Sequence, residues 1–192
     1  DVNKDHFNID VSSLEKKLKK KVPKILVSVH LGGQAPEQEK LRELSKKYNF
    51  FIIEDASHSL GASRKNSRVG NCKWSDITVF SFHPVKMITT AEGGIATTNN
   101  KLFYNKMLKL RNHGITRNQN ELKTKRLGFW YYEQQCLGFN YRMNEIQAAL
   151  GLSQLKRLKS FVEKRNLLAK NYNKLIEGLP LSRQKILVSN VS

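Results

Sequence analysis

Short apolar runs alternate with helical stretches along the first half of the chain, and polar residues follow the runs closely. The runs at 25–29, 50–53 and 77–82 are rich in Ile, Val and Phe and have the length of buried strands. Apolar residues recur at helical spacing in 12–22 and 36–48. This alternation predicts an α/β fold with a parallel or mixed sheet covered by helices. Open sheets of this kind bind ligands beyond the strand ends, so residues there are candidate site residues.

One lysine follows the third apolar run directly. Lys86 lies in the segment 81–94 among small and apolar residues, whereas most other lysines lie in solvated helices. A lysine held just past a buried strand loses solvation, which disfavours its ammonium form and makes its amine a nucleophile. Asp55 comes after the second run. Pyridoxal phosphate needs a lysine and a carboxylate at opposite edges of its ring, so the pair predicts a site for this cofactor.

Charge and composition limit the other classes of protein. The net charge is +18, from 34 basic and 16 acidic residues, which suits either an anionic partner or a merely lysine-rich surface. No zinc-finger, RNA-recognition or helix-turn-helix pattern is present, so the motifs argue against nucleic acid. No apolar run has the length of a membrane span, and Cys72 and Cys136 lack metal-site spacing. We therefore expect a cytoplasmic protein with no bound metal and no membrane contact.

Three motifs then occur in a fixed order: EDASHSLGA at 54–62, SFHPVKMITTAEGG at 81–94 and LGFNYRMNEIQAALGL at 137–152. The residues of these motifs and their order resemble those of the sugar aminotransferases of the DegT/DnrJ/EryC1/StrS family. The resemblance extends from near residue 1 to about residue 180. The segment WYYEQQ at 130–135 most resembles the branch of the family that acts in pseudaminic acid synthesis, on a UDP-linked 4-keto-6-deoxy-N-acetyl hexose.

The resemblance implies a role for each matching residue. Lys86 would be the catalytic residue, holding pyridoxal 5′-phosphate covalently and moving a proton during transfer. Asp55 would pair with the pyridine nitrogen, His58 would lie beside the ring, and Ser81 would contact the phosphate. Asn140 would reach the phosphate of the neighbouring subunit. Each also has a plainer interpretation: a surface lysine, a helix cap, a strand serine, or turn residues in the case of His58 and Asn140.

The resemblance also implies a domain organisation. The fold would be that of the pyridoxal-phosphate-dependent transferases of fold type I, with only part of the large domain present. We expect residues 1–143 to belong to this cofactor-binding domain and 144–180 to form a long helix leading toward a small domain. Residues 181–192 would start that mostly absent C-terminal domain. Family members also begin with a Gly- and Thr/Ser-rich phosphate-binding loop; no such segment precedes Asp1, so we expect the chain to be incomplete.

The function implied is an aminotransferase of polysaccharide biosynthesis. An amino acid, expected to be glutamate, would donate an amino group to a nucleotide-diphosphate-linked 4-keto-6-deoxy sugar in a homodimer with shared active sites. Two alternatives remain open. The chain could be a non-catalytic, basic binding or regulatory protein on the same scaffold, although such a copy should have lost Lys86 or Asp55. The same chemistry could also act on a different keto sugar, such as a 3-keto sugar.

Overall fold

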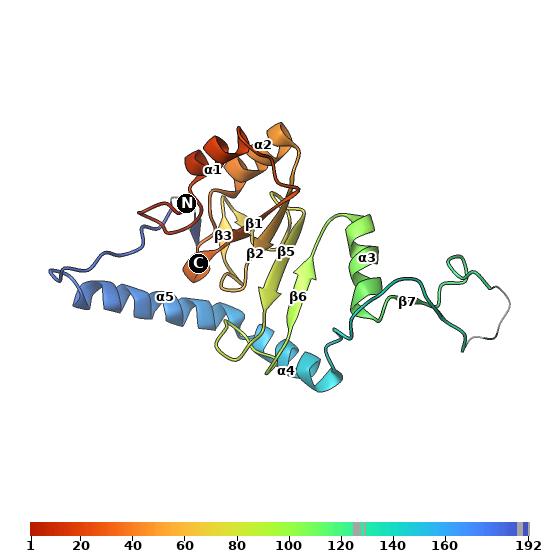
Figure 1. Cartoon of the computed structure of the whole chain (residues 1–192). Coiled ribbons are helices and arrows are strands. Elements are labelled where there is room, and N and C mark those ends of the chain that lie inside the picture. Colours follow the sequence, from red (N-terminus) through yellow and green to blue (C-terminus); the bar gives the residue numbers. More distant parts are fainter. Residues whose placement is uncertain (125–127, 129, 188–189, 192) are drawn as a thin grey trace. The chain divides into compact units, whose positions relative to one another are not determined.

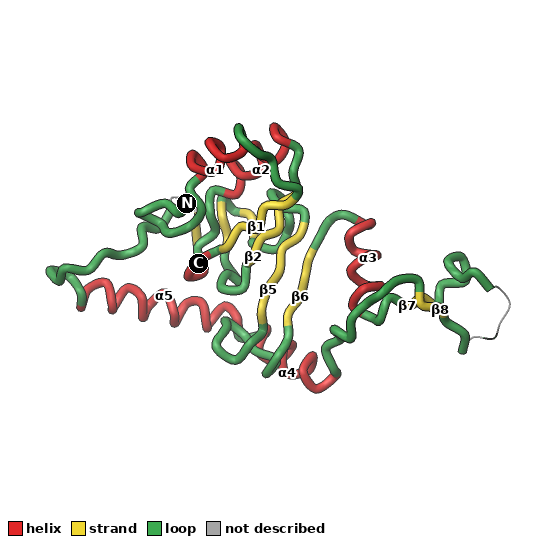
Figure 2. Tube along the Cα trace, in the orientation of Figure 1, coloured by secondary structure: helices red, strands yellow, loops and turns green. Residues whose placement is uncertain are grey.

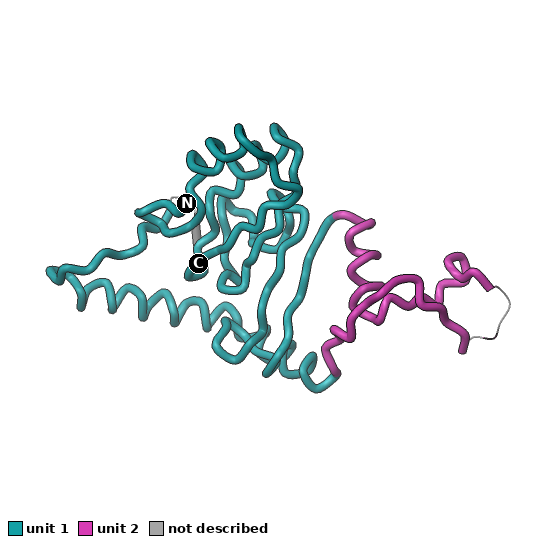
Figure 3. Tube along the Cα trace, viewed as in Figure 1, with its two compact units in different colours: residues 1–99, 145–192 teal, residues 100–144 magenta. Residues whose placement is uncertain are grey.

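The computed structural model describes residues 1–124, 128, 130–187 and 190–191. The chain forms two compact units, residues 1–99 with 145–192 and residues 100–144 (Figure 3). Both the sheet and the long C-terminal helices belong to the first unit. The expected division into a large domain, a connecting helix and the start of a small domain stays a prediction. No helix in the described part of the chain is long and apolar enough to traverse a membrane.

A four-stranded mixed sheet organises the first unit (Figures 1 and 2). Its strands are β1 (Ile25–Val29), β2 (Phe51–Asp55), β5 (Ile77–Ser81) and β6 (Gly94–Thr97), in the spatial order β1-β2-β5-β6. The first three run parallel, and β6 runs antiparallel to β5. The three apolar runs therefore form the three parallel strands, and the predicted α/β fold with a mixed sheet is confirmed.

Two helices cover one face of this sheet. They are α1 (Val11–Leu18), capped by the Asp10 side chain, and α2 (Gln38–Tyr48). A cluster of buried side chains lies between the helices and the sheet: Leu18, Leu41, Leu44, Phe50 and Ile52. Burying an apolar side chain of this size contributes about 1.5–3 kcal/mol, so the cluster is the main hydrophobic core of the unit.

The opposite face of the sheet is largely open. Ile25, Val27 and Val29 of β1 and Phe51 of β2 are each 45% to 57% exposed. Side chains on a strand alternate between faces, and only the inward set of these strands packs under α1 and α2. The prediction that residues 25–29 form a buried strand is therefore correct for one face only.

Shorter elements complete the first unit. A 3₁₀ turn, η1 (Leu31–Gly33), follows β1. A small antiparallel sheet contains β3 (Ser63–Arg64), β4 (Ser67–Arg68) and β9 (Asn190–Val191), in the order β4-β3-β9.

The segment 144–180, expected to be one long helix, forms two helices. These are α4 (Glu145–Leu155) and α5 (Leu158–Leu175). Arg157 has φ −102° and ψ 0°, outside the helical region, and its N–H donates to Gln154 O at 2.9 Å, a tighter closure than an α-helical bond. The Arg157 carbonyl then accepts from the Phe161 N–H and starts the next helix. A periodic apolar pattern runs across this break and so conceals it.

The second unit contains α3 (Lys101–Arg111) and a two-residue antiparallel pair, β7 (Ile115–Thr116) with β8 (Glu133–Gln134). The Asn100 side chain caps α3 by accepting from the N–H groups of Leu102 and Phe103. Such a cap contributes about 1 kcal/mol.

Candidate active site

Two predicted site residues end neighbouring parallel strands. Asp55 is the last residue of β2 and pairs in register with Val79 of β5. Ser81, the last residue of β5, lies two positions beyond Val79. Because strand side chains alternate between faces, Asp55 and Ser81 project from the same face of the sheet. The register brings the carboxylate and the hydroxyl to one edge of the sheet, and both residues are half-buried.

Local hydrogen bonds fix the carboxylate of Asp55. Its Oδ1 accepts from the Ser57 hydroxyl at 2.6 Å and from the Ser57 N–H at 3.2 Å. Its backbone carbonyl accepts from the His30 N–H at 3.0 Å. The next residue, Ala56, donates its N–H to Val79 O at 2.9 Å, which extends the pairing with β5 past the end of β2. Asp55 is therefore held by its own turn and by both neighbouring strands.

Lys86 lies on the loop that joins β5 to β6. The two ends of this loop are joined by the Phe82 N–H, which donates to Gly93 O at 2.8 Å, and the Phe82 carbonyl accepts from the Thr90 N–H at 3.0 Å. The Lys86 N–H donates to His83 O at 3.0 Å and closes a turn around the lysine. The sequence predicted a desolvated lysine, whereas Lys86 is only half-buried. The reason is that it lies on a turn beyond the strand rather than on the strand.

Two glycines allow close packing around this loop. A Cβ on Gly94 would lie 2.7 Å from the Phe80 carbonyl oxygen, so the first residue of β6 has no room for a side chain. A Cβ on Gly151 of α4 would lie 2.7 Å from Thr90 Cγ2. Helix α4 therefore packs directly against the loop that holds Lys86 in place.

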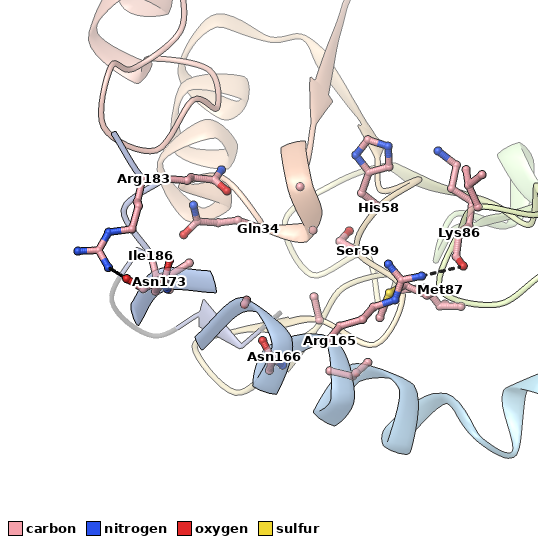
Figure 4. Close-up of a pocket in the computed structure, with 18 residues that line it drawn as sticks. Gln34, His58, Ser59, Lys86, Met87, Arg165, Asn166, Asn173, Arg183 and Ile186 are labelled. Carbon is pink, nitrogen blue, oxygen red and sulfur yellow. Dashed lines mark hydrogen bonds between the residues drawn. The ribbon is translucent and has the colours of Figure 1, made fainter. Parts of the chain in front are cut away.

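A cavity of about 440 Å³ lies beside Lys86 in the first unit (Figure 4). Its walls come from the turn after β1, the turn after β2, the Lys86 loop, α5 and the segment after α5. Of the predicted site residues, His58 and Lys86 line it, and Figure 4 shows both at the same end. Asp55 and Ser81 are not among its lining residues. The predicted site residues of the first unit thus fall into two pairs. Asp55 and Ser81 lie at the sheet edge, and His58 and Lys86 line the cavity.

Asn140 belongs to the second unit. There its backbone forms a bridge with Asn112, and the flanking Phe139 and Tyr141 rings stack with their centroids 4.8 Å apart. Asn140 is exposed, as a residue that reaches a neighbouring subunit would have to be. Its role at the cofactor phosphate stays a prediction.

A buried polar pair lies beneath the Asp55 turn. His30 is fully buried, its Nδ1 is 3.0 Å from the Ser59 hydroxyl, and its Nε2 is 3.9 Å from Glu54 Oε1. Burial lowers the pKa of His30 from 6.5 to about 4, against a smaller upward effect of Asp55. Burial raises the pKa of Glu54, against hydrogen bonds from Gln38 and Thr78. Burial therefore disfavours the charged form of each group, and the lowered pKa of His30 makes the pair a packed structural support.

Sequence reasoning missed the far wall of the cavity. Arg165 and Asn173 of α5 line it, together with Arg183 from the segment after the helix. The only signal in the sequence was basic character, which 34 residues share. Among the residues that the structure describes, no group of three or more His, Cys, Asp or Glu could hold a metal ion.

A mixed sheet with a carboxylate at the end of one parallel strand and a lysine on the loop after the next is consistent with the class of pyridoxal-phosphate-dependent transferases of fold type I. A family model described as the DegT/DnrJ/EryC1/StrS aminotransferase family matches residues 1–189. The chain therefore belongs to this family, as its three motifs indicated.

Three comparisons place it within the family. The UDP-4-amino-4,6-dideoxy-N-acetyl-beta-L-altrosamine transaminase of Campylobacter jejuni (strain 81-176) is 42% identical over 176 residues, covering 91% of this chain and 44% of that protein. The structure of Helicobacter pylori PseC, an aminotransferase involved in the biosynthesis of pseudoaminic acid, is 37% identical, with a TM-score of 0.81 over 93% of this chain and 45% of that one. The putative sugar aminotransferase Spr1654 of Streptococcus pneumoniae, in its PMP form, is 30% identical, with a TM-score of 0.79 over 93% and 49%. The chain thus spans about half the length of the relatives it matches.

Proposed function

We propose that the protein transfers an amino group from an amino acid to the keto carbon of a nucleotide-linked sugar, using pyridoxal phosphate held at Lys86. The observation that carries this proposal is the position of Lys86, on a loop closed by hydrogen bonds and beside an open cavity. Its volume of about 440 Å³ lies within the range of about 300–1,000 Å³ typical of small-molecule sites. The names of the relatives support a UDP-linked 4-keto-6-deoxy sugar as the acceptor.

The residues present fit the cofactor. Lys86 has no Asp or Glu carboxylate within ion-pair distance in the described structure, so its amine is available for covalent attachment. Asp55 and Ser81 project from one face at the sheet edge, where a carboxylate could pair with a ring nitrogen and a hydroxyl could donate to a phosphate. When bound, pyridoxal phosphate supplies an aldehyde that accepts amino groups and a ring that stabilises negative charge on the neighbouring carbon.

In the proposed reaction each residue would have a defined role. Lys86 Nζ would hold the cofactor and, once displaced by a substrate amine, would take the proton from the carbon that bears this amine. Asp55 would keep the ring nitrogen protonated, Ser81 and Asn140 would hold the phosphate, and His58 would lie beside the ring. In the net exchange the amino acid would become a 2-oxo acid and the keto sugar an amino sugar. We infer glutamate as the donor and a homodimer in which Asn140 serves the partner's site.

The test is covalent trapping. The protein with its natural termini is incubated with pyridoxal phosphate, reduced with borohydride, and digested for mass spectrometry. We expect an absorbance band in the visible before reduction and the reduced adduct on Lys86. Lys86→Ala should lose both, while Lys73→Ala, which removes an exposed loop lysine beside Trp74, should keep both. Adducts scattered over surface lysines, or an unchanged band in Lys86→Ala, would refute the proposal and favour the non-catalytic alternative.

A further inference from the structure

The far wall of the Lys86 cavity is rich in positive charge and amide groups. We call this the α5 wall and define it by Arg165, Asn166, Ala169, Asn173, Arg183 and Gln184. Three cationic side chains line the cavity, Lys86, Arg165 and Arg183, and none of the 18 lining residues is Asp or Glu. Figure 4 shows Arg165 on the Lys86 side of the cavity and Arg183 near Asn173 on the other. The positive charge of its lining therefore favours an anionic ligand in this cavity.

Among the residues that the structure describes, both arginines lack a carboxylate partner. Arg165 Nη2 donates to the Lys86 carbonyl at 3.5 Å, and Arg183 Nη1 donates to the Asn173 carbonyl at 3.2 Å. No Asp or Glu lies within ion-pair distance of either one in the ranges that the structure describes. In contrast, Arg64 forms an ion pair with Glu39 at 2.7 Å. The guanidinium groups of the α5 wall thus have N–H donors that are not used by a carboxylate. Each guanidinium group can donate to two phosphate oxygens at once.

Helical spacing shapes the wall. Arg165, Ala169 and Asn173 are four residues apart, so they lie in one row on a single face of α5. Eight residues of helix separate the first from the last by about 12 Å. The small side chain of Ala169 leaves space between the two ends of the row. An extended anionic ligand can therefore lie along α5 with a cationic group near each end.

We propose that the α5 wall binds the diphosphate of the nucleotide-linked sugar, with Arg165 and Arg183 as its two anchors. This inference rests on the proposed function, because it places the sugar between the diphosphate and Lys86. The shared chemistry is a phosphate anion, and the cofactor itself is the other source of such a group. Both arginines line the cavity, whereas Ser81, the proposed contact of the cofactor phosphate, does not. We therefore assign the wall to the substrate.

The test measures binding by calorimetry on the protein with its natural termini. Ligands are UDP, uridine, inorganic phosphate, glutamate and pyridoxal phosphate, each at low and high salt. We expect UDP to bind at least about tenfold more tightly than uridine, with affinity falling as salt rises. Arg165→Gln and Arg183→Gln should each weaken UDP binding about tenfold or more. Lys170→Gln removes a charge from the same helix outside the cavity lining and should leave UDP binding unchanged.

An additional variant and a cofactor-trapping measurement distinguish failure of this inference from failure of the proposed function. Arg165→Lys keeps the charge but loses the planar fork, so it should recover UDP binding only in part. Trapping of pyridoxal phosphate on Lys86 should be unchanged in all the arginine variants. Weaker cofactor trapping with unchanged UDP binding would overturn the inference and assign the wall to the cofactor phosphate. Equal UDP affinity in the arginine variants and Lys170→Gln would also overturn it. Arginine-dependent UDP binding without trapping on Lys86 would support the wall and refute the proposed function.

Discussion

Acidification should destabilise the fold through His30, the histidine beneath the Asp55 turn. Its pKa is lowered by burial from 6.5 to about 4, so the unfolded chain binds a proton at this imidazole at a higher pH than the folded chain does. The contribution of His30 to stability is therefore present above pH 6.5 and is lost as the pH falls toward 4. Each tenfold change in proton affinity corresponds to about 1.4 kcal/mol, which sets a ceiling of about 3 kcal/mol. Between pH 7 and pH 5 alone, the expected loss is about 2 kcal/mol.

The assay compares the protein with His30→Gln by urea unfolding at pH 7, 6 and 5. The glutamine keeps a polar group near Ser59 and removes the titration, and all other titrating groups cancel in the difference between the two proteins. We expect this difference in unfolding free energy to change by about 2 kcal/mol from pH 7 to pH 5. A difference that stays constant within about 0.5 kcal/mol would show that His30 titrates alike in both states and would refute the reasoning.

Glu54 provides a control in which stability should change with pH in the opposite direction. Its pKa is raised by burial, so its contribution is fully present below the ordinary value of 4.5 and is lost as the pH rises through its folded value. The difference between the protein and Glu54→Gln should therefore move in the opposite direction over the same pH range. Shifts of the same sign in both comparisons would point to a general effect of acid rather than to these two groups.

Three further predictions follow from the site and the core. Asp55→Asn should keep pyridoxal phosphate trapped on Lys86 but lower the rate of transamination by about 10²–10³-fold, measured as release of the 2-oxo acid. Normal turnover would refute its role. Gly151→Ala should lower the unfolding free energy by about 1–3 kcal/mol, because its Cβ meets Thr90 Cγ2 at 2.7 Å, and Thr90→Ser should relieve this cost in a double-mutant cycle. Additive effects would contradict the contact. Leu41→Ala, at a 2% exposed core position, should cost about 2–5 kcal/mol in urea unfolding, whereas Leu167→Ala, 59% exposed on α5, should cost far less.

The sequence predicted those parts of the site that depend on strand ends. Asp55, Ser81 and Lys86 each lie at or just beyond the end of an apolar run, and a parallel register places such ends at one edge. Periodicity was sufficient because the runs are short and clearly bounded. The three motifs supplied the family, and the comparison with known families confirmed it.

The remaining features depend on contacts that periodicity does not encode. The break at Arg157 leaves the apolar spacing of α4 and α5 intact, so the periodic pattern predicts a single helix. Arg165 and Arg183 belong to the site only because α5 and the segment after it return to the turns that follow β1 and β2. The pKa of His30 is lowered and that of Glu54 is raised because both side chains are buried, which the neighbouring residues in sequence do not reveal. The open face of the sheet could not be predicted either, since a strand exposed on one side has the same composition as a buried one.

The anchoring of Lys86 has a consequence for how such a protein can diversify. The loop with Lys86, the proposed nucleophile, is held at both ends by β5 and β6, whereas the α5 wall belongs to α5 and the segment after it. Substitutions at positions 166, 169 and 173 change the wall without altering any of the hydrogen bonds described for the lysine loop, whereas Arg165 donates to the Lys86 carbonyl at 3.5 Å. A library restricted to that helix face could therefore be screened for new acceptor molecules while the chemical step keeps its geometry. Selection could act on the same division, altering substrate preference many times over an unchanged reaction centre.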